Sequence, residues 1–412
     1  MVEKRNTPEI RFEGFTDPWE QRKLGEFSKK RTTKNADGTL SETFTNSAEQ
    51  GVISQLDYFD HDITNDANIS GYYVVRPDDF VYNPRISATA PCGPINRNRL
   101  NRAGVMSPLY TVFSVDETVD KTYLEHCFKT SRWHDFMFLE GNSGARSDRF
   151  SISDATFFEM PIWCPEISEQ RMIAKQLETA DRLITLHQRK YDKLTQLKKS
   201  MLDKMFPKPG ERFPEIRFAG FTDPWEQRKL GELCTISKGH GYSKADIRDA
   251  GTPLILYGRL YTQYESRIED VDTFAVEQEG SLLSKGAEVI VPASGETAED
   301  IAVASSVRRS GIIFGSDLNV VTPVNKLDPD YTALAITYSK AHDDLAKRAQ
   351  GKSVVHVHGN DIAEVEISYP SESEQKRIST VILGLDNLIT LHQRKLNLLK
   401  NTKKSLLDKM FV

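Results

Sequence analysis

The chain has 412 residues, of which 38% are hydrophobic and 27% charged, a composition typical of a soluble globular protein with more than one core. No window approaches the ~20 consecutive apolar residues that a membrane span needs, and no apolar stretch follows the charged start, so we expect neither a membrane helix nor a secretory signal. The net charge of −5 argues mildly against nucleic-acid binding, although a local basic face matters more than this average. The 4 cysteines form no Cys-x-x-Cys pair, which predicts buried thiols in a reducing cytoplasm.

The first element along the chain is a motif that occurs twice. Residues 8–26 read PEIRFEGFTDPWEQRKLGE, and residues 214–232 repeat this motif with one change, Glu13 to Ala219. Two later motifs also return, LITLHQRK unchanged and KKSMLDKMF as KKSLLDKMF. The chain therefore consists of two half-proteins in tandem.

Two inserts of unrelated sequence lie between these repeated motifs, at residues 35–163 and 239–369. If the two halves had simply diverged after a duplication, substitutions would be spread over the whole repeat. Here the repeated motifs, which form the frame of each half, are almost unchanged. Variable segments on a fixed frame usually hold the binding function. We therefore expect the inserts to carry the specificity of the protein.

The first insert has the composition of short strands and turns. Strands are predicted at residues 72–75, 79–83 and 109–113, and a helix at residues 121–139. No acidic residue occurs from Phe80 to Val115. Arginine suits phosphate or guanine, and asparagine can pair with adenine, so this region and the polar loop at 141–149 predict DNA contacts. The candidates are Arg85, Arg97, Asn98, Arg99, Arg102, Arg146 and Arg149, of which about half are expected to be ordinary surface side chains.

A long helix follows the first insert, between Pro165 and Pro207. Its apolar positions alternate between steps of three and four residues, which is a heptad seam. A helix of about 40 residues is ~60 Å long at 1.5 Å per residue. The predicted interface residues are Leu177, Ile184, His187, Tyr191 and Leu194.

The second insert also predicts strands, at residues 288–291, 301–304 and 311–314. Its candidate DNA-binding residues are Arg308, Arg309, Lys347, Arg348 and Lys352. His356 and His358 alternate with valine, but no further Cys or His nearby completes a metal site, so we interpret them as polar strand positions and expect no metal.

A second long helix ends the chain and repeats the seam. Its predicted interface residues are Ile382, Ile389, His392, Leu396 and Leu399. Two equal seams without a third favour mutual antiparallel pairing over packing of each helix onto its own domain. The fold class is thus α+β, with two mixed-sheet domains held by two long antiparallel coiled-coil helices in an internal pseudo-two-fold repeat. The expected segments are a first recognition domain at 1–164, a helix at 165–207, a second recognition domain at 208–370 and a helix at 371–412.

The halves, the variable inserts and the frame motifs resemble a specificity subunit of a type I restriction–modification enzyme over essentially the whole chain. The resemblance implies that each insert is a target recognition domain for one half of a split double-stranded DNA sequence. It also implies that the helices hold the domains apart and dock two modification subunits, with restriction subunits in the same assembly. S-adenosylmethionine, ATP and Mg²⁺ would act on those partners, and this chain would bind no cofactor and have no catalytic residue.

The residues agree with this division of labour. No Asn-Pro-Pro-aromatic methyltransferase motif is present, since Asn83-Pro84-Arg85-Ile86 lacks the second proline and the aromatic. Gly351-Lys352-Ser353 resembles the end of a phosphate loop, but Ala346 stands in place of the first glycine. Two alternatives stay open: a self-contained nuclease or methyltransferase, and a coiled-coil adaptor without DNA reading.

Overall fold

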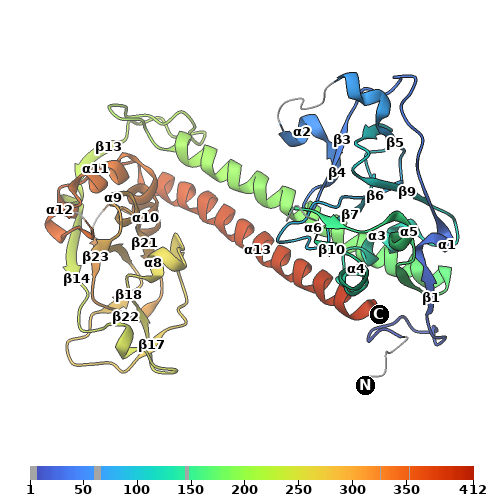
Figure 1. The fold of residues 1–412 in the computed structure, drawn as a ribbon. Coiled ribbons are helices and arrows are strands. Elements are labelled where there is room, and N and C mark those ends of the chain that lie inside the picture. Colours follow the sequence, from blue (N-terminus) through green and yellow to red (C-terminus); the bar gives the residue numbers. More distant parts are fainter. Residues whose placement is uncertain (1–6, 60–65, 144–147, 325, 352) are drawn as a thin grey trace. The chain divides into compact units, whose positions relative to one another are not determined.

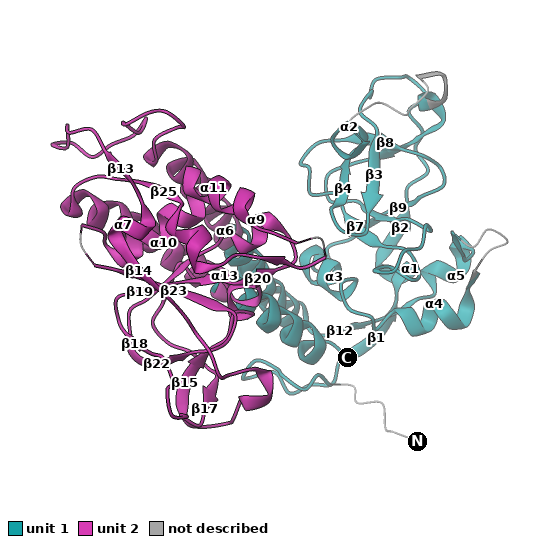
Figure 2. Ribbon diagram, turned by 90° about the vertical axis from the view of Figure 1, so that its left-hand side faces the viewer, with its two compact units in different colours: residues 1–186, 395–412 teal, residues 187–394 magenta. Residues whose placement is uncertain are grey.

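The computed structural model describes residues 7–59, 66–143, 148–324, 326–351 and 353–412. The chain forms two compact units, the first from residues 1–186 and 395–412 and the second from residues 187–394 (Figure 2). Both units mix helix and sheet, so the predicted α+β class with two domains is confirmed. In the described part of the chain, no helix is long and apolar enough to cross a membrane.

The two long helices are uninterrupted (Figure 1): α6 spans Ile167–Met205 and α13 spans Glu372–Met410, 39 residues each. In the first unit, Leu177 near the start of α6 shares a core with Met410 at the end of α13. In the second unit the opposite ends meet, since Met205 shares a core with Ile382. The start of each helix therefore packs on the end of the other, and the antiparallel pairing is confirmed.

The predicted seam faces inward along both helices. Leu177, Ile382 and Leu396 are buried, and the other predicted seam residues are half-buried: Ile184, His187, Tyr191, Leu194, Ile389, His392 and Leu399. In the second unit His187 Nδ1 lies 2.8 Å from His392 Nδ1.

The lysines of the two seams form matched ion pairs. Lys198 Nζ lies 2.5 Å from Asp386 Oδ1 in the second unit. Lys403 pairs with Asp181 at the equivalent place in the first unit. The ammonium groups that the seam carries are thus neutralised by the facing helix.

The repeated frame motif fastens each domain to its helix. Arg11 donates two hydrogen bonds to the fully buried carboxylate of Glu169 on α6, at 2.7 and 2.8 Å. Arg217 and Glu374 on α13 repeat this pair at the same distances in the second unit. Charge-assisted, bidentate bonds of this kind fix orientation as well as adding energy. The motif is therefore largely a structural clamp.

The core of the first unit is a four-stranded antiparallel sheet of order β2-β9-β6-β7. The strand bounds are β1 Glu20–Lys23, β2 Ser28–Lys30, β3 Phe44–Ser47, β4 Gly51–Ser54, β5 Tyr73–Val75, β6 Phe80–Tyr82, β7 Ile95–Arg97, β8 Gly104–Met106, β9 Thr111–Val115, β10 Asn142–Ser143, β11 Phe150–Ser151 and β12 Pro161–Cys164. The helices besides α6 are α1 Leu24–Phe27, α2 Gln55–Phe59, η1 Asp66–Gly71, α3 Lys121–Cys127, α4 His134–Glu140 and α5 Asp154–Phe158.

The second unit contains a five-stranded sheet of order β14-β23-β19-β21-β16 and a four-stranded sheet of order β17-β15-β22-β18. The strand bounds are β13 Glu226–Lys229, β14 Cys234–Lys238, β15 Thr252–Ile255, β16 Arg267–Ile268, β17 Phe274–Ala275, β18 Leu283–Lys285, β19 Glu288–Pro292, β20 Ser294–Gly295, β21 Ser305–Val307, β22 Ser310–Phe314, β23 Leu318–Pro323, β24 Val355–His356 and β25 Glu366–Tyr369. The helices besides α13 are α7 Leu230–Leu233, η2 Lys244–Asp246, α8 Arg259–Thr262, α9 Ala298–Ile301, α10 Pro329–Tyr338, α11 Lys340–Arg348 and α12 Gly359–Ala363.

The two domains are built alike although their inserts differ in sequence. Asp120 caps α3 and Asp328 caps α10, each accepting a backbone N–H at the start of its helix. Three residues after each cap a buried tyrosine, Tyr123 or Tyr331, donates its hydroxyl hydrogen to a carbonyl beside the long helix, at 2.6 Å in both cases. The pattern Asp-x-x-Tyr is therefore a shared signature of the inserts.

Most predicted strands are present within a residue or two, as β5, β6, β9, β19 and β22. The helix predicted at 121–139 is wrong in extent. It breaks into α3 and α4, because the Thr130 hydroxyl donates to the Cys127 carbonyl and competes with helix continuation. The strand predicted at 301–304 is also wrong, since the Thr297 hydroxyl accepts the Asp300 N–H and starts α9 there.

The four cysteines are free and buried, as predicted. Burial raises the pKa of Cys92 to about 11 and that of Cys127, Cys164 and Cys234 to about 12. These thiols therefore stay protonated and unreactive at neutral pH.

Candidate nucleic-acid interface

Two of the predicted DNA-binding residues in the first domain lie inside the structure. Arg97 has a side chain only 12% exposed and donates from Nε to Asp78 at 2.8 Å. Asn98 is buried, and its amide nitrogen donates to the backbone carbonyls of Arg76 and Arg102. Both side chains are thus held by other residues of the domain, and as DNA contacts they stay predictions. Arg97 links the end of β7 to the turn before β6, and Asn98 links that turn to the one between β7 and β8.

Two other arginines are exposed but bound to carboxylates. Arg99 lies 2.7 Å from Glu125 and 3.0 Å from Glu178 on α6. Arg102 makes two hydrogen bonds of 2.7 Å to Glu42, and this pairing lowers the pKa of the Glu42 carboxyl. A phosphate or a base would have to displace these carboxylates. A DNA contact by Arg99 or Arg102 remains a prediction.

Arg85 and Arg149 are arranged differently. They form an isolated antiparallel backbone bridge just beyond the end of β6. Neither guanidinium has a hydrogen-bond or ion-pair partner among the described residues. Arg85 is exposed and Arg149 half-buried. Of the predicted arginines in the described part of this domain, these two alone lack such a partner and are therefore available for a ligand.

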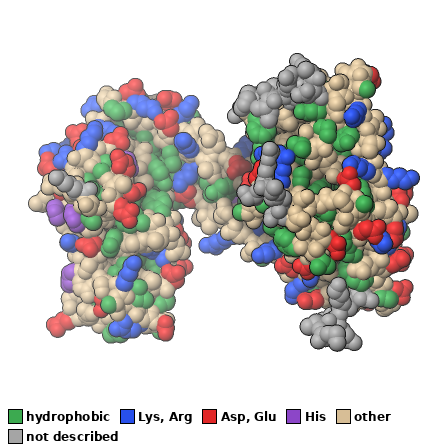
Figure 3. Space-filling model, in the orientation of Figure 1, with side chains coloured by type: hydrophobic (Ala, Val, Ile, Leu, Met, Phe, Trp, Pro, Cys, Tyr) green, Lys and Arg blue, Asp and Glu red, His purple; other side chains and the backbone are tan. Residues whose placement is uncertain are grey.

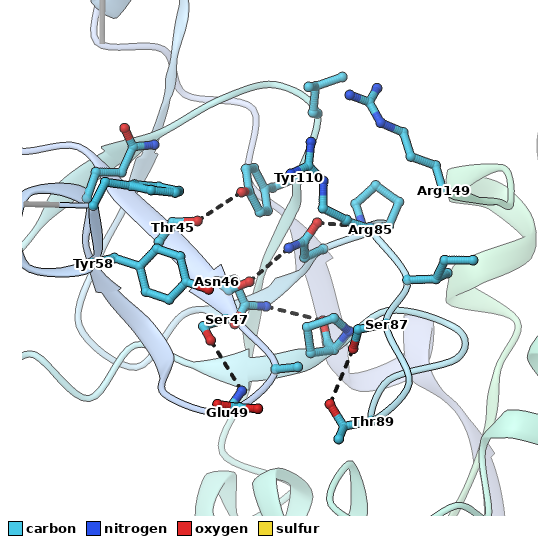
Figure 4. Close-up of a pocket in the computed structure, with 18 residues that line it drawn as sticks. Thr45, Asn46, Ser47, Glu49, Tyr58, Arg85, Ser87, Thr89, Tyr110 and Arg149 are labelled. Atoms are coloured by element: carbon cyan, nitrogen blue, oxygen red, sulfur yellow. Dashed lines mark hydrogen bonds between the residues drawn. The ribbon is translucent and has the colours of Figure 1, made fainter. Parts of the chain in front are cut away.

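Arg85 and Arg149 line a pocket of about 490 Å³ in the first domain (Figure 4). This volume lies in the range of sites that hold small ligands, roughly 300–1,000 Å³. The opposite wall carries Thr45 and Tyr110, whose hydroxyls are 3.1 Å apart, and the exposed ring of Tyr58. Hydroxyls, unpaired guanidinium groups and an aromatic face together suit base edges and phosphates.

Thr45, Tyr58 and Tyr110 were not among the predicted residues. They lie far from Arg149 in the sequence, and no local pattern links them to this pocket. The stretch without acidic residues, from Phe80 to Val115, includes Arg85 and Tyr110, and it is the one sequence signal that falls on this pocket.

In the second domain most predicted cations are ion-paired. Arg308 lies 3.8 Å from Asp330, Arg309 2.6 Å from Asp270, and Arg348 3.3 Å from Asp344. Lys347 is exposed and has no ion pair among the described residues. Two further predicted residues, Arg146 and Lys352, lie outside the residues that the structure describes.

Of the two alternating histidines, His356 ends β24, as predicted, but His358 is not a strand residue. It precedes α12, and its backbone carbonyl accepts the N–H groups of Asp361 and Ile362. In the part of the chain that is described, no group of three or more His, Cys, Asp or Glu side chains could hold a metal ion. On the face shown in Figure 3, basic and acidic side chains are interspersed over each unit.

Comparison with known proteins gives a consistent assignment. Residues 222–401 match the family model of the type I restriction modification DNA specificity domain. Over 270 residues the chain is 21% identical to the type I restriction enzyme MjaVIII specificity subunit of Methanocaldococcus jannaschii. This match covers 62% of the chain and 62% of that relative.

Two solved structures were matched, and the first of them, with a TM-score above 0.5, is similar in fold. The type I restriction-modification S subunit from M. genitalium matches 98% of this chain and 99% of its own, with a TM-score of 0.57 and 13% identity. The HsdS subunit from Thermoanaerobacter tengcongensis matches 95% of this chain and 96% of its own, with a TM-score of 0.44 and 16% identity. The frame motifs and the paired helices agree with this match, and the chain is similar to type I restriction–modification specificity subunits, with the DNA specificity domain matched over residues 222–401.

Proposed function

We propose that this chain reads the DNA target of a type I restriction–modification complex. Each domain binds one half of a bipartite, asymmetric sequence, and the two long helices set the spacer between the halves. The chain performs no catalysis. S-adenosylmethionine, ATP and Mg²⁺ belong on the partner subunits, which carry out methylation and DNA translocation with cleavage in the cytoplasm.

One observation carries the DNA-reading proposal. The strand order β2-β9-β6-β7 of the first domain recurs as β14-β23-β19-β21 within the larger sheet of the second. The capped helices and the clamps to the long helices also recur, yet the residues exposed at the ends of equivalent strands differ. A fixed scaffold with different contact residues recognises two different ligands of one class. An asymmetric split DNA sequence is such a pair of ligands, because each half presents a different pattern of donors and acceptors.

The partner proposal rests on surface residues that the repeat keeps identical. Leu183 and Leu186 on α6 are 36% and 46% exposed, and their counterparts Leu388 and Leu391 on α13 are both 46% exposed. Residues three apart share one helix face, so each helix presents the same apolar pair. Because these side chains do not fill the core, its packing does not explain their identity. Two equal surfaces suit two copies of one partner, the modification subunit, with restriction subunits joining the same assembly.

The proposal is tested by binding labelled DNA duplexes to partner subunits assembled with and without this chain. We expect sequence-specific binding only when the chain is present, with an affinity that falls as salt is raised, because phosphate contacts release counterions. Assembly of a stable complex that binds all sequences equally would refute DNA reading and favour the adaptor alternative. Methylation by the purified chain with S-adenosylmethionine alone would refute the non-catalytic role.

A further inference from the structure

Strand pairing aligns the two domains residue by residue. Ser28 pairs with Val115 in the first domain, and Cys234 pairs with Pro323 in the second, each directly after the repeated frame motif. Continuing along these registers, the first domain pairs Tyr82 with Thr111 and the second pairs Val291 with Asn319. Tyr82 at the end of β6 therefore corresponds to Val291 near the end of β19.

The returning strand confirms this alignment. Phe150 N donates to Pro84 O at 2.8 Å, and Val357 N donates to Ala293 O at 3.1 Å. One residue away from these bonds, Arg85 bridges Arg149 in the first domain. In the second domain β20 and β24 pair Ser294 with His356 at the same place. Ser294 is thus the counterpart of Arg85, and His356 is the counterpart of Arg149.

Ser294 and His356 form a small accessible polar site. Ser294 Oγ lies 3.1 Å from His356 Nδ1, and Tyr261 donates its hydroxyl hydrogen to the Ser294 carbonyl at 2.7 Å. His356 is exposed and Ser294 half-buried. No carboxylate pairs with His356 among the described residues. The site therefore offers hydrogen-bonding groups to a ligand without displacement of an ion pair.

We propose that Ser294 and His356 read a base in the second half-site, at the position where Arg85 and Arg149 read a base in the first. This inference rests on the proposed function. The arginines offer only donors, which suit the two acceptors O6 and N7 of guanine. Together a serine hydroxyl and a neutral imidazole have two donors and three acceptor positions, and the hydrogen bond between them uses one of each. In either histidine tautomer the Ser294–His356 pair therefore still offers one donor and at least one acceptor. That set matches adenine, which presents N6 as a donor and N7 as an acceptor.

The test uses the complete complex and a library of randomised DNA duplexes, with sequencing of the duplexes that become methylated. In Ser294→Arg/His356→Arg, one position of the second half-site should change from adenine to guanine, with a change in base preference of about tenfold or more. In Arg85→Ser/Arg149→His, one position of the first half-site should lose its guanine preference. Arg132→Ser, which alters an exposed arginine of the first domain that is not among the proposed DNA contacts, serves as the matched control and should change neither half.

The possible outcomes separate the inference from the proposed function. If the wild-type complex selects no sequence, the proposed function fails. If it selects a sequence that the Ser294→Arg/His356→Arg complex selects unchanged, only the inference fails. Ser294→Ala covers the case in which the double variant does not fold, because it removes the hydroxyl without adding bulk. It should relax the base preference at the same position, and an unaltered preference would again overturn the inference.

Discussion

Lengthening both long helices by one heptad should lengthen the DNA spacer and leave the half-sites unchanged. The change is a duplication of LITLHQR, residues 183–189 in α6 and 388–394 in α13. Seven residues add about 10.5 Å at ~1.5 Å per residue, and they nearly preserve the face that each helix presents. At ~3.4 Å per base pair this corresponds to about three base pairs.

The assay is methylation by the assembled complex of duplexes that carry both half-sites at every spacing. The optimum should move by about three base pairs. The affinity should fall, because three pairs rotate the half-sites by roughly a third of a turn. As a control, duplication in α6 alone moves Lys198 away from Asp386 and should destabilise the chain. An unchanged optimum in the doubly lengthened chain, or altered bases in either half-site, would refute the role of the helices as a spacer.

Three variants test other parts of the structure. Arg11→Met leaves the fully buried Glu169 carboxylate unpaired and should lower the free energy of unfolding by ~3–5 kcal/mol, measured by denaturant titration. Burial, reinforced by the charge of Lys403, lowers the pKa of His126 to about 4. The neutral histidine therefore contributes stability that is fully present above pH ~6.5, and on the order of 3 kcal/mol is lost as the pH falls towards ~4. His126→Gln should weaken this acid sensitivity, measured by unfolding at a series of pH values. Leu186→Glu combined with Leu391→Glu should weaken binding of the modification subunit in a pull-down without lowering the melting temperature of the chain.

Each of these results has a control. Adding Glu169→Leu to Arg11→Met should recover most of the lost stability, because it removes the buried charge. If His126→Gln unfolds with the same pH dependence as the wild type, the neutral buried histidine is not responsible for the acid sensitivity. Partner binding that survives both leucine substitutions would place the docking surface elsewhere on the chain.

The helical frame could be predicted because its signals are local. A heptad seam is visible in the sequence itself, and the matched seams, including the residues that became the His187–His392 contact, were sufficient to predict antiparallel pairing. The break between α3 and α4 was missed because the side-chain bond that ends the first helix, from Thr130, leaves the apolar pattern unchanged.

The candidate interface was less predictable because its properties depend on contacts between distant residues. Arg99 and Arg85 lie in the same stretch without acidic residues, so the sequence does not distinguish them as DNA contacts. In the structure Arg99 pairs with Glu178, which lies 79 residues away along the chain. No pattern in the sequence reveals that Arg85 lacks such a partner. The correspondence of Arg85 with Ser294 is equally invisible without strand registers, because the inserts share no sequence around these positions.

The most direct test of the central claim is to exchange the first insert, residues 35–163, for that of another specificity subunit and to sequence the methylated sites in DNA from cells that make the complex. The account predicts that one half of the methylated target changes while the other half and the spacer stay the same. A change in both halves, or in neither, would contradict the claim that each domain reads its own half-site.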